Sequence, residues 1–217
     1  MGRNLVNTLV GGAPEGSGAD SLGAMTDPTR QFDIGTLGGT QPPAKDTDRR
    51  PVAWSGGADV GMLLLRLGVG GIFVAHGLQK VFGMWGGRGI GETTTILTDL
   101  GFRQAPALAW ALGFGELILG AMLVLGLFTP LAAAGLLAVK ICAVVVKWGS
   151  PFFAADSPNA LELDVALGAG VAALLFVGAG RISLDSGRTW QRRPVPWAVL
   201  FLVVGVVVAV GVLFGLR

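Results

Sequence analysis

Residues 106–148 read PALAWALGFGELILGAMLVLGLFTPLAAAGLLAVKICAVVVKW and carry only three charged side chains, Glu116, Lys140 and Lys147. The stretch divides into two apolar runs, 106–127 and 130–148. Each is close to the about 20 residues that an α-helix needs to cross about 30 Å of hydrocarbon. Because only Phe128, Thr129 and Pro130 join the two runs, the helices must be antiparallel. This stretch therefore predicts a transmembrane hairpin.

Three further apolar segments have the same character and flank the hairpin, at 60–82, 161–179 and 196–216. The sequence thus predicts an all-α membrane protein in which four helices form a bundle and a fifth transmembrane helix follows at the C-terminus. The glycine-rich loop 83–105 is long enough to contain a short interfacial helix near Thr93–Leu100.

The composition separates this membrane part from a polar N-terminal segment. Of the whole chain, 52% is hydrophobic and 14% is charged, which is about half the charged share of soluble domains. Residues 1–59 hold 7 of the 14 acidic residues and are rich in Gly, Pro, Ser and Thr. We predict an extended polar arm over 1–59 that is disordered alone and binds a partner surface. The apolar run Leu5–Val10 is too short for a convincing signal peptide.

The small number of metal-ligating side chains excludes several kinds of site. Cys142 is the only cysteine and His76 the only histidine. The chain therefore cannot form an internal disulfide, a bis-histidine haem site or a multi-histidine metal site, and we predict no metal site and no covalently bound cofactor. The basic residues are scattered rather than interleaved with aromatic ones, so nucleic acid is not a predicted partner.

The distribution of basic residues favours a cytoplasmic N-terminus and an extracytoplasmic C-terminus in the cell membrane. With that orientation the cytoplasmic side holds six bases: Arg49, Arg50, Arg181, Arg188, Arg192 and Arg193. The other side holds five: Lys80, Arg88, Arg103, Lys147 and Arg217. We predict that the arm is cytoplasmic.

Ionisable residues inside the predicted spans are the candidate functional site, because each costs at least about 2.5 kcal/mol to insert and normally faces a partner in the bundle. We predict a polar pocket formed by Arg66, His76, Lys80, Glu116, Lys140, Glu162 and Asp164. His76 and Lys80 are four residues apart and share a helix face.

If the helices alternate in direction, the charged residues fall into two groups by depth. Glu116 and Lys140 lie near the midplane, with Arg66 somewhat further in. The group near the outer end consists of His76, Lys80, Lys147, Glu162 and Asp164. Two interpretations stay open: structural ion pairs that fix helix register, or a pocket that hydrogen-bonds a quinone head group or relays protons. We interpret His76 itself as a hydrogen-bonded interior histidine, and assign no catalytic residue.

Several of these motifs occur together in one known family. The runs LLRLG at 64–68 and HGLQKVFG at 76–83 are followed by GEL at 115–117, LGLFTP at 125–130 and GAGRISLD at 178–185. In this order they resemble the DoxX family over about residues 60–187. The resemblance implies a four-helix membrane module, 60–187, that the arm 1–59 precedes and that a basic loop with a fifth helix, 188–217, follows.

The DoxX resemblance also implies a place in redox membrane complexes. The Ala-, Gly-, Val- and Arg-rich composition is typical of high-GC actinobacteria. We therefore expect an accessory, non-catalytic subunit of a respiratory electron-transfer complex, with cytochrome bc and cytochrome oxidase subunits as partners and lipid or menaquinone as ligand. The alternative is a quinone-linked oxidoreductase module that uses the buried His, Lys and Glu groups. A small transporter is less favoured, because the sequence has no inverted repeat and no span broken by proline.

Overall fold

The structure, a computed structural model, describes residues 55–153 and 160–217, which contain helices and no strands. The predicted arm therefore lies almost entirely outside the described residues. The described elements, in chain order, are α1 (Gly56–Phe82), η3 (Met84–Gly86), α2 (Gly89–Asp99), α3 (Ala105–Leu125), α4 (Thr129–Val146), α5 (Glu162–Val177), α6 (Thr189–Arg192), α7 (Pro194–Val210) and η5 (Gly211–Gly215). The predicted all-α fold is confirmed, and α2 contains the short helix expected in the loop 83–105.

Four described helical segments are long and apolar enough to cross a membrane: Gly56–Phe82, Ala105–Leu125, Thr129–Val146 and Pro194–Gly215. These correspond to the first, second, third and fifth predicted spans. The fourth predicted span, 161–179, becomes α5, which has 16 residues. At 1.5 Å per residue it is about 24 Å long, shorter than the hydrocarbon thickness of about 30 Å. Its first turn carries Glu162 and Asp164, so α5 is both shorter and more polar at its start than the others.

Helix α1 begins four residues earlier than predicted. Ser55 is its N-cap, and the Ser55 hydroxyl accepts a hydrogen bond from the Ala58 N–H at 3.3 Å. A capping serine satisfies one of the free N–H groups of a first helical turn. Residues 56–59, which the sequence assigned to the arm, therefore form the first turn of α1.

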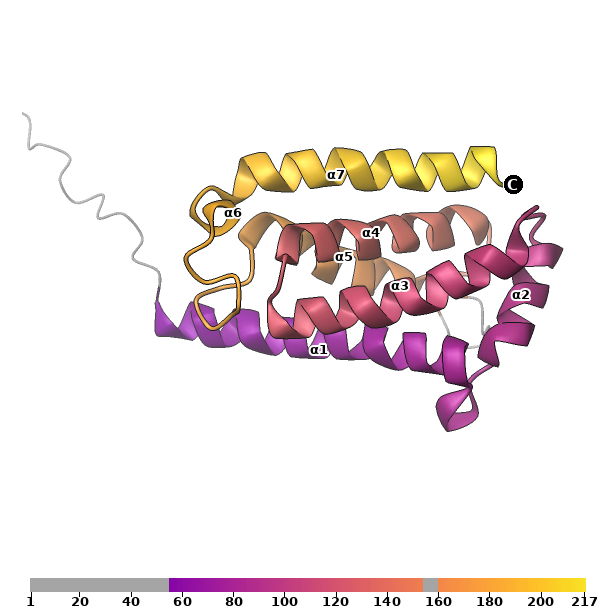
Figure 1. Cartoon of the computed structure of the whole chain (residues 1–217), viewed down its shortest axis with the longest axis horizontal. Coiled ribbons are helices and arrows are strands. Elements are labelled where there is room, and N and C mark those ends of the chain that lie inside the picture. Colours follow the sequence, from indigo (N-terminus) through magenta and orange to yellow (C-terminus); the bar gives the residue numbers. More distant parts are fainter. Residues whose placement is uncertain (1–54, 154–159) are drawn as a thin grey trace, which may run out of the picture. The chain divides into compact units, whose positions relative to one another are not determined.

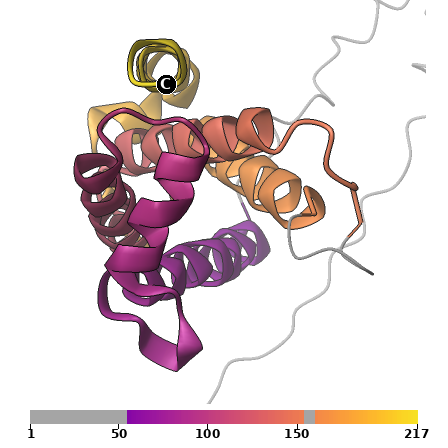
Figure 2. The same ribbon diagram turned by 90° about the vertical axis from the view of Figure 1, so that its right-hand side faces the viewer.

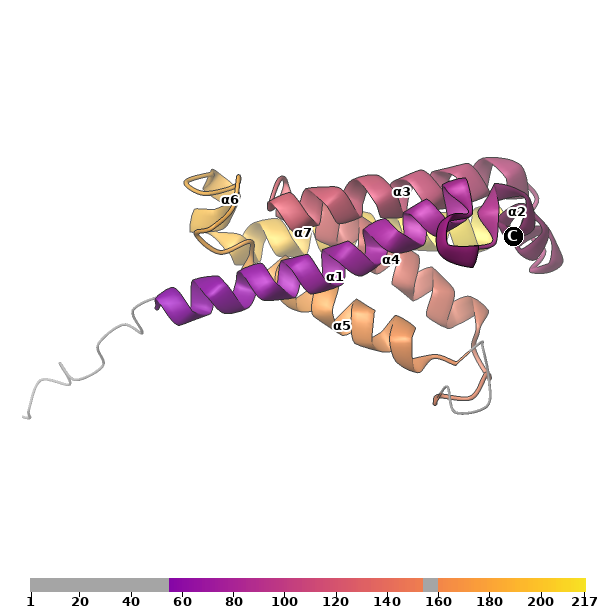
Figure 3. The same cartoon turned by 90° about the horizontal axis from the view of Figure 1, so that it is seen from below.

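The long helices run antiparallel to their chain neighbours and pack side by side (Figure 1). The most extensive contact is that of α1 with α3, while α4 packs against α3, α5 and α7. Helix α2 lies across the end of the bundle where α1 ends and α3 begins (Figures 1 and 2). Viewed from below, α3 and α5 lie on opposite sides of α1 (Figure 3). The apolar core has its largest fully buried members in Phe73, Leu123, Leu136, Leu174 and Leu175.

Glycines let α1 and α3 approach closely. A Cβ added at Gly77 of α1 would lie 2.6 Å from the backbone nitrogen of Leu117 in α3. A Cβ added at Gly120 of α3 would lie 2.9 Å from the backbone nitrogen of Val74. Both distances are shorter than a carbon–nitrogen contact allows, so only glycine fits at these two crossing points. Small residues at helix crossings are the usual means of close packing where water does not drive association.

Replacing Gly77 by leucine should therefore disrupt the bundle, because the side chain would push α1 away from the α3 backbone. We expect a destabilisation of about 1–3 kcal/mol or more. It should be seen as a lower midpoint of thermal unfolding by circular dichroism in mild detergent. The matched control is Gly68→Leu, in the same helix, where an added Cβ meets nothing within 4 Å. Equal midpoints for the two variants would show that Gly77 does not control the α1–α3 contact.

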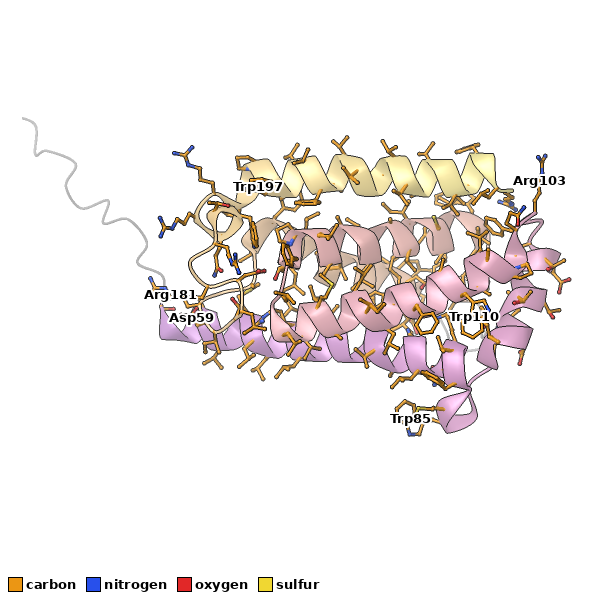
Figure 4. The ribbon with its side chains drawn as sticks, in the orientation of Figure 1. Asp59, Trp85, Arg103, Trp110, Arg181 and Trp197 are labelled. Atoms are coloured by element: carbon orange, nitrogen blue, oxygen red, sulfur yellow. The ribbon has the colours of Figure 1, made fainter. Side chains whose placement is uncertain are left out.

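The two ends of the bundle hold different basic residues. The start of α1 lies at the same end as Arg181, whose backbone N–H donates to Asp59 Oδ1 at 2.7 Å. The C-terminus lies at the other end, where the Arg103 N–H donates to the Leu216 carbonyl at 2.8 Å. Figure 4 shows Asp59 and Arg181 together at one end and Arg103 at the other. The structure thus groups the described basic residues by end as the sequence predicted, and the side of the membrane that each end faces stays a prediction.

Candidate functional site

The first buried ion pair joins α1 to α3. Lys80 in the last turn of α1 donates to Glu116 Oε2 in the middle of α3. The Glu116 side chain is 2% exposed and that of Lys80 is 26% exposed. The pair lies beside Gly113, where a Cβ would be 3.5 Å from the Lys80 Cβ. The close packing of the two helices therefore brings a carboxylate in mid-span within reach of a lysine near the helix end.

The second group of charges joins α4 to α5. Asp164 in the first turn of α5 accepts from Lys140 Nζ at 2.9 Å and from Lys147 Nζ at 2.8 Å. The two lysines are seven residues apart, so they lie on one face of α4 about two turns apart. Lys140 and Asp164 are both buried, whereas the Lys147 side chain is 34% exposed. One carboxylate thus forms ion pairs with two ammonium groups.

His76 lies between these two groups. Its half-buried imidazole is within electrostatic reach of Lys80, Glu116, Lys140 and Asp164. The Lys140 ammonium also lies 5.1 Å from the centre of the Phe73 ring in α1, a cation–π distance. We call His76, Lys80, Glu116, Lys140, Lys147 and Asp164 the polar cluster. The hydrogen bond expected for His76 is not found among residues 55–153 and 160–217.

The polar cluster, which does not include Glu162, carries more positive than negative charges. Lys80, Lys140 and Lys147 face Glu116 and Asp164, which leaves three ammonium groups against two carboxylates. Glu162 starts α5 and is half-buried, but its carboxylate forms no ion pair with any described residue. Burying unequal charge in a medium of low dielectric constant is costly. The cluster is therefore a place where an electronegative ligand atom would be favoured.

The expected grouping by depth differs from the observed pairing. Glu116 and Lys140 were expected at one level, yet Glu116 pairs with Lys80 and Lys140 pairs with Asp164. For Glu116 the reason is the packing of α1 on α3, because Gly77 lies against Leu117 and Lys80 lies beside Gly113, which puts Glu116 close to the level of Lys80. For Lys140 the reason is the length of the lysine side chain, which holds its ammonium several ångströms from its Cα.

Arg66 lies apart from the polar cluster, at the α3–α4 turn. Its guanidinium donates to the Ile182 carbonyl and, at 3.5 Å, to the Val124 carbonyl in the last turn of α3. The side chain is 1% exposed. A cation at a helix C-terminus satisfies free carbonyls and complements the helix dipole. The structure thus places this candidate site residue in a contact with the backbone.

Asp185 binds the free N–H groups at the start of α4, at the same turn where Arg66 binds carbonyls at the end of α3. Its two carboxylate oxygens accept from the Phe128 N–H at 2.9 Å and the Thr129 N–H at 2.8 Å, at the start of α4. Between the two helices Gly126 has a φ of +64°, and a Cβ there would lie 2.1 Å from an Arg66 guanidinium nitrogen. We call Arg66, Gly126 and Asp185 the turn lock. Sequence reasoning did not assign Asp185, because an acid after a helix gives no sign of a partner 57 positions earlier.

A groove opens beside the polar cluster between α4 and α5. Its volume is about 200 Å³. Six of its lining residues are apolar or glycine, and the remaining two are the paired Lys140 and Asp164. The groove therefore combines an apolar wall with one buried ion pair, and it is smaller than the about 300–1,000 Å³ of a typical small-molecule site.

Residues 61–148, which run from the second turn of α1 to just after the end of α4, match the DoxX family model. This part of the chain is therefore similar to a DoxX domain. The matched part includes His76, Lys80, Glu116 and Lys140, whereas Asp164 and Asp185 lie beyond it. No curated protein and no solved structure matches the chain. The predicted resemblance to the DoxX family is thus confirmed over residues 61–148, and the long apolar helices are those of a multi-pass membrane protein.

Proposed function

We propose that the chain is an accessory integral-membrane subunit of a respiratory electron-transfer complex, a cytochrome bc and cytochrome oxidase assembly, and that it stabilises the complex or its quinone and lipid environment. The observation that supports this role is the engagement of the buried charges. Lys80 pairs with Glu116, and Lys140 pairs with Asp164. Arg66 contacts backbone carbonyls. Charges already paired in this way fix helix positions rather than stay free for chemistry.

The apolar surface of the helices also supports a subunit role. In α7 and η5, ten large hydrophobic side chains between Val195 and Phe214 are at least 40% exposed. Such a surface fits a neighbouring transmembrane helix as well as it fits lipid. The sequence supplies only one histidine, so haem ligation would have to come from partner subunits.

Purification of the tagged chain from its native membrane in mild detergent tests this proposal. We expect haem proteins to be recovered with it, detected by b- and c-type absorbance bands and by mass spectrometry of the subunits. A chain that lacks residues 1–50 keeps Ser55 and all of α1, so it should insert normally but lose these partners if the arm binds them. Recovery of the full-length chain without any haem protein would contradict the proposal.

The second candidate, a quinone-linked oxidoreductase module, is favoured by the groove beside Lys140 and Asp164 and by the unbonded imidazole of His76. Quinone extraction from the same purified sample distinguishes this module from the accessory subunit. If the chain is a quinone-linked module, Lys140→Met should lower the amount of bound quinone while the protein stays assembled. If Lys140→Met or Glu116→Gln instead reduces assembly, and the quinone content of the remaining protein is unchanged, the ion pairs are structural.

A further inference from the structure

We propose that the end of the bundle around α6 binds an anionic phospholipid, with the phosphate at Arg188, Arg192 and Arg193 and part of one acyl chain in an aromatic groove between α4 and α7. This site lies at the opposite end of the bundle from Arg103 and the C-terminus, and it is separate from the polar cluster. It does not depend on the proposed respiratory role.

Charge is the first evidence for the ligand. Arg181, Arg188, Arg192 and Arg193 are all exposed. The only acidic residue in 178–217 is Asp185, which is 1% exposed and has both oxygens engaged in the turn lock. The exposed charge of this segment is therefore entirely positive, and guanidinium groups are suited to bind phosphate oxygens.

An apolar groove next to these arginines is the second evidence. It has a volume of about 90 Å³ and is lined by Phe128, Pro130, Leu131, Trp190, Trp197 and Phe201, without any polar side chain except the indole N–H groups. Aromatic rings form a continuous wall, with centroid distances of 5.2 Å for Phe128–Trp190, 6.5 Å for Trp190–Trp197 and 6.2 Å for Trp197–Phe201. Figure 4 shows Trp197 at the α6 end of α7.

The position of the groove suits a lipid rather than a soluble anion. Helix α7 begins at Pro194, so the two tryptophans lie where a transmembrane helix enters the bilayer, the level at which Trp is enriched. The Arg188 guanidinium lies 5.8 Å from the centre of the Trp190 ring, so charge and apolar wall are adjacent. A free phosphate would use the arginines alone, whereas a phospholipid uses both parts.

Trp190 adds a specific contact. Its Nε1 is buried and has no hydrogen-bond partner in the described residues. Buried donors are nearly always paired in native proteins. An ester or phosphate oxygen of the lipid would provide this acceptor after a small movement of the ring.

The test is a titration of the purified full chain, by native mass spectrometry, with phosphatidylglycerol and with phosphatidylcholine of the same acyl chains. Each basic residue near an anionic lipid surface contributes about fivefold in affinity. We therefore expect Arg192→Gln/Arg193→Gln to bind phosphatidylglycerol at least about tenfold more weakly. The matched control is Arg88→Gln/Arg103→Gln, which removes two exposed arginines that lie outside this segment and should bind as the unmodified chain does.

A second variant tests the acyl-chain part. Leu131→Trp should fill the groove and weaken binding of long-chain phosphatidylglycerol, while binding of its short-chain analogue changes less. Circular dichroism confirms that each variant is folded. Equal affinity for the two lipids, equal loss in the Arg88/Arg103 control, or full competition by inorganic phosphate would each overturn the proposal.

Discussion

Asp164→Asn should unfold the bundle at a markedly lower temperature than the unmodified chain. The substitution removes the one carboxylate among residues 55–153 and 160–217 that contacts Lys140 and Lys147, at 2.9 and 2.8 Å. The Lys140 side chain is 7% exposed, so its ammonium would be left unpaired in a medium of low dielectric constant. Removing one partner of a buried ion pair costs about 3–5 kcal/mol.

Two measurements would show this loss in mild detergent. Circular dichroism reports the thermal melting of the helices. Reaction of Cys142 with a thiol-reactive fluorogenic reagent reports the opening of the α4–α7 contact, because this single cysteine has its Sγ 3.8 Å from the Ala209 carbonyl. Both signals should change at a lower temperature in Asp164→Asn.

Two further variants make the interpretation specific. Glu162→Gln alters an acid two residues away that has no ion-pair partner among the described residues, so its effect should stay within about 0.5 kcal/mol. Lys140→Met/Asp164→Leu removes both buried charges, and the 34%-exposed Lys147 can extend towards the interface. Replacing a buried pair by apolar side chains is often neutral or stabilising, so this double variant should recover most of the stability. A melting temperature for Asp164→Asn equal to that of Glu162→Gln would contradict the role of Asp164.

Arg66→Met should have an effect of similar size through the turn lock. It leaves the Val124 and Ile182 carbonyls without their donor, and it leaves Asp185 without a nearby positive charge. Hydrogen bonds to charged groups contribute about 1.5–3 kcal/mol each, and an unpaired buried charge adds to the loss. We expect a destabilisation of about 3 kcal/mol or more, measured by the same thermal melts.

A double-mutant comparison of Arg66 and Asp185 shows whether the two residues stabilise the turn together or through separate contacts. Asp185→Asn should destabilise by about 2 kcal/mol, because the amide keeps only one acceptor for the Phe128 and Thr129 N–H groups. If both residues hold one turn, Arg66→Met/Asp185→Asn should cost less than the sum of the single variants. Arg88→Met is the control, since Arg88 forms an exposed pair with Glu92 at 3.5 Å, and such pairs contribute at most about 1 kcal/mol. Strict additivity would show two independent sites.

The backbone at the turn lock explains why both charges are needed there. Phe128 adopts a φ of +46°, a left-handed conformation that costs a residue with a side chain about 1–3 kcal/mol. Its N–H is held by Asp185 and its ring packs on Trp190. These contacts offset the strain and allow a connection short enough to keep α3 and α4 antiparallel. The same packing links the turn lock to the aromatic groove proposed to bind lipid.

The sequence by itself determined the helical class, the hairpin of residues 106–148 and the presence of charged side chains inside the bundle. These follow from local properties: the length of an apolar run, the shortness of a connection and the cost of burying a charge. The limits of α3 and α4 differ from the predicted ones by at most two residues. The motifs at 64–68, 76–83 and 115–130 also sufficed to indicate the DoxX family.

Only the tertiary structure decided which charges meet. Lys80 reaches Glu116 because Gly77 and Gly113 let α1 and α3 approach closely, and one carboxylate on α5 serves two lysines of α4. Arg66 contacts a carbonyl 116 positions away, and Asp185 caps a helix that begins 56 positions earlier. Partners so distant depend on helix rotation and on the reach of flexible side chains, which no local pattern encodes. The apolar runs therefore specify where the helices are, and the packing of the helices specifies what their charges do.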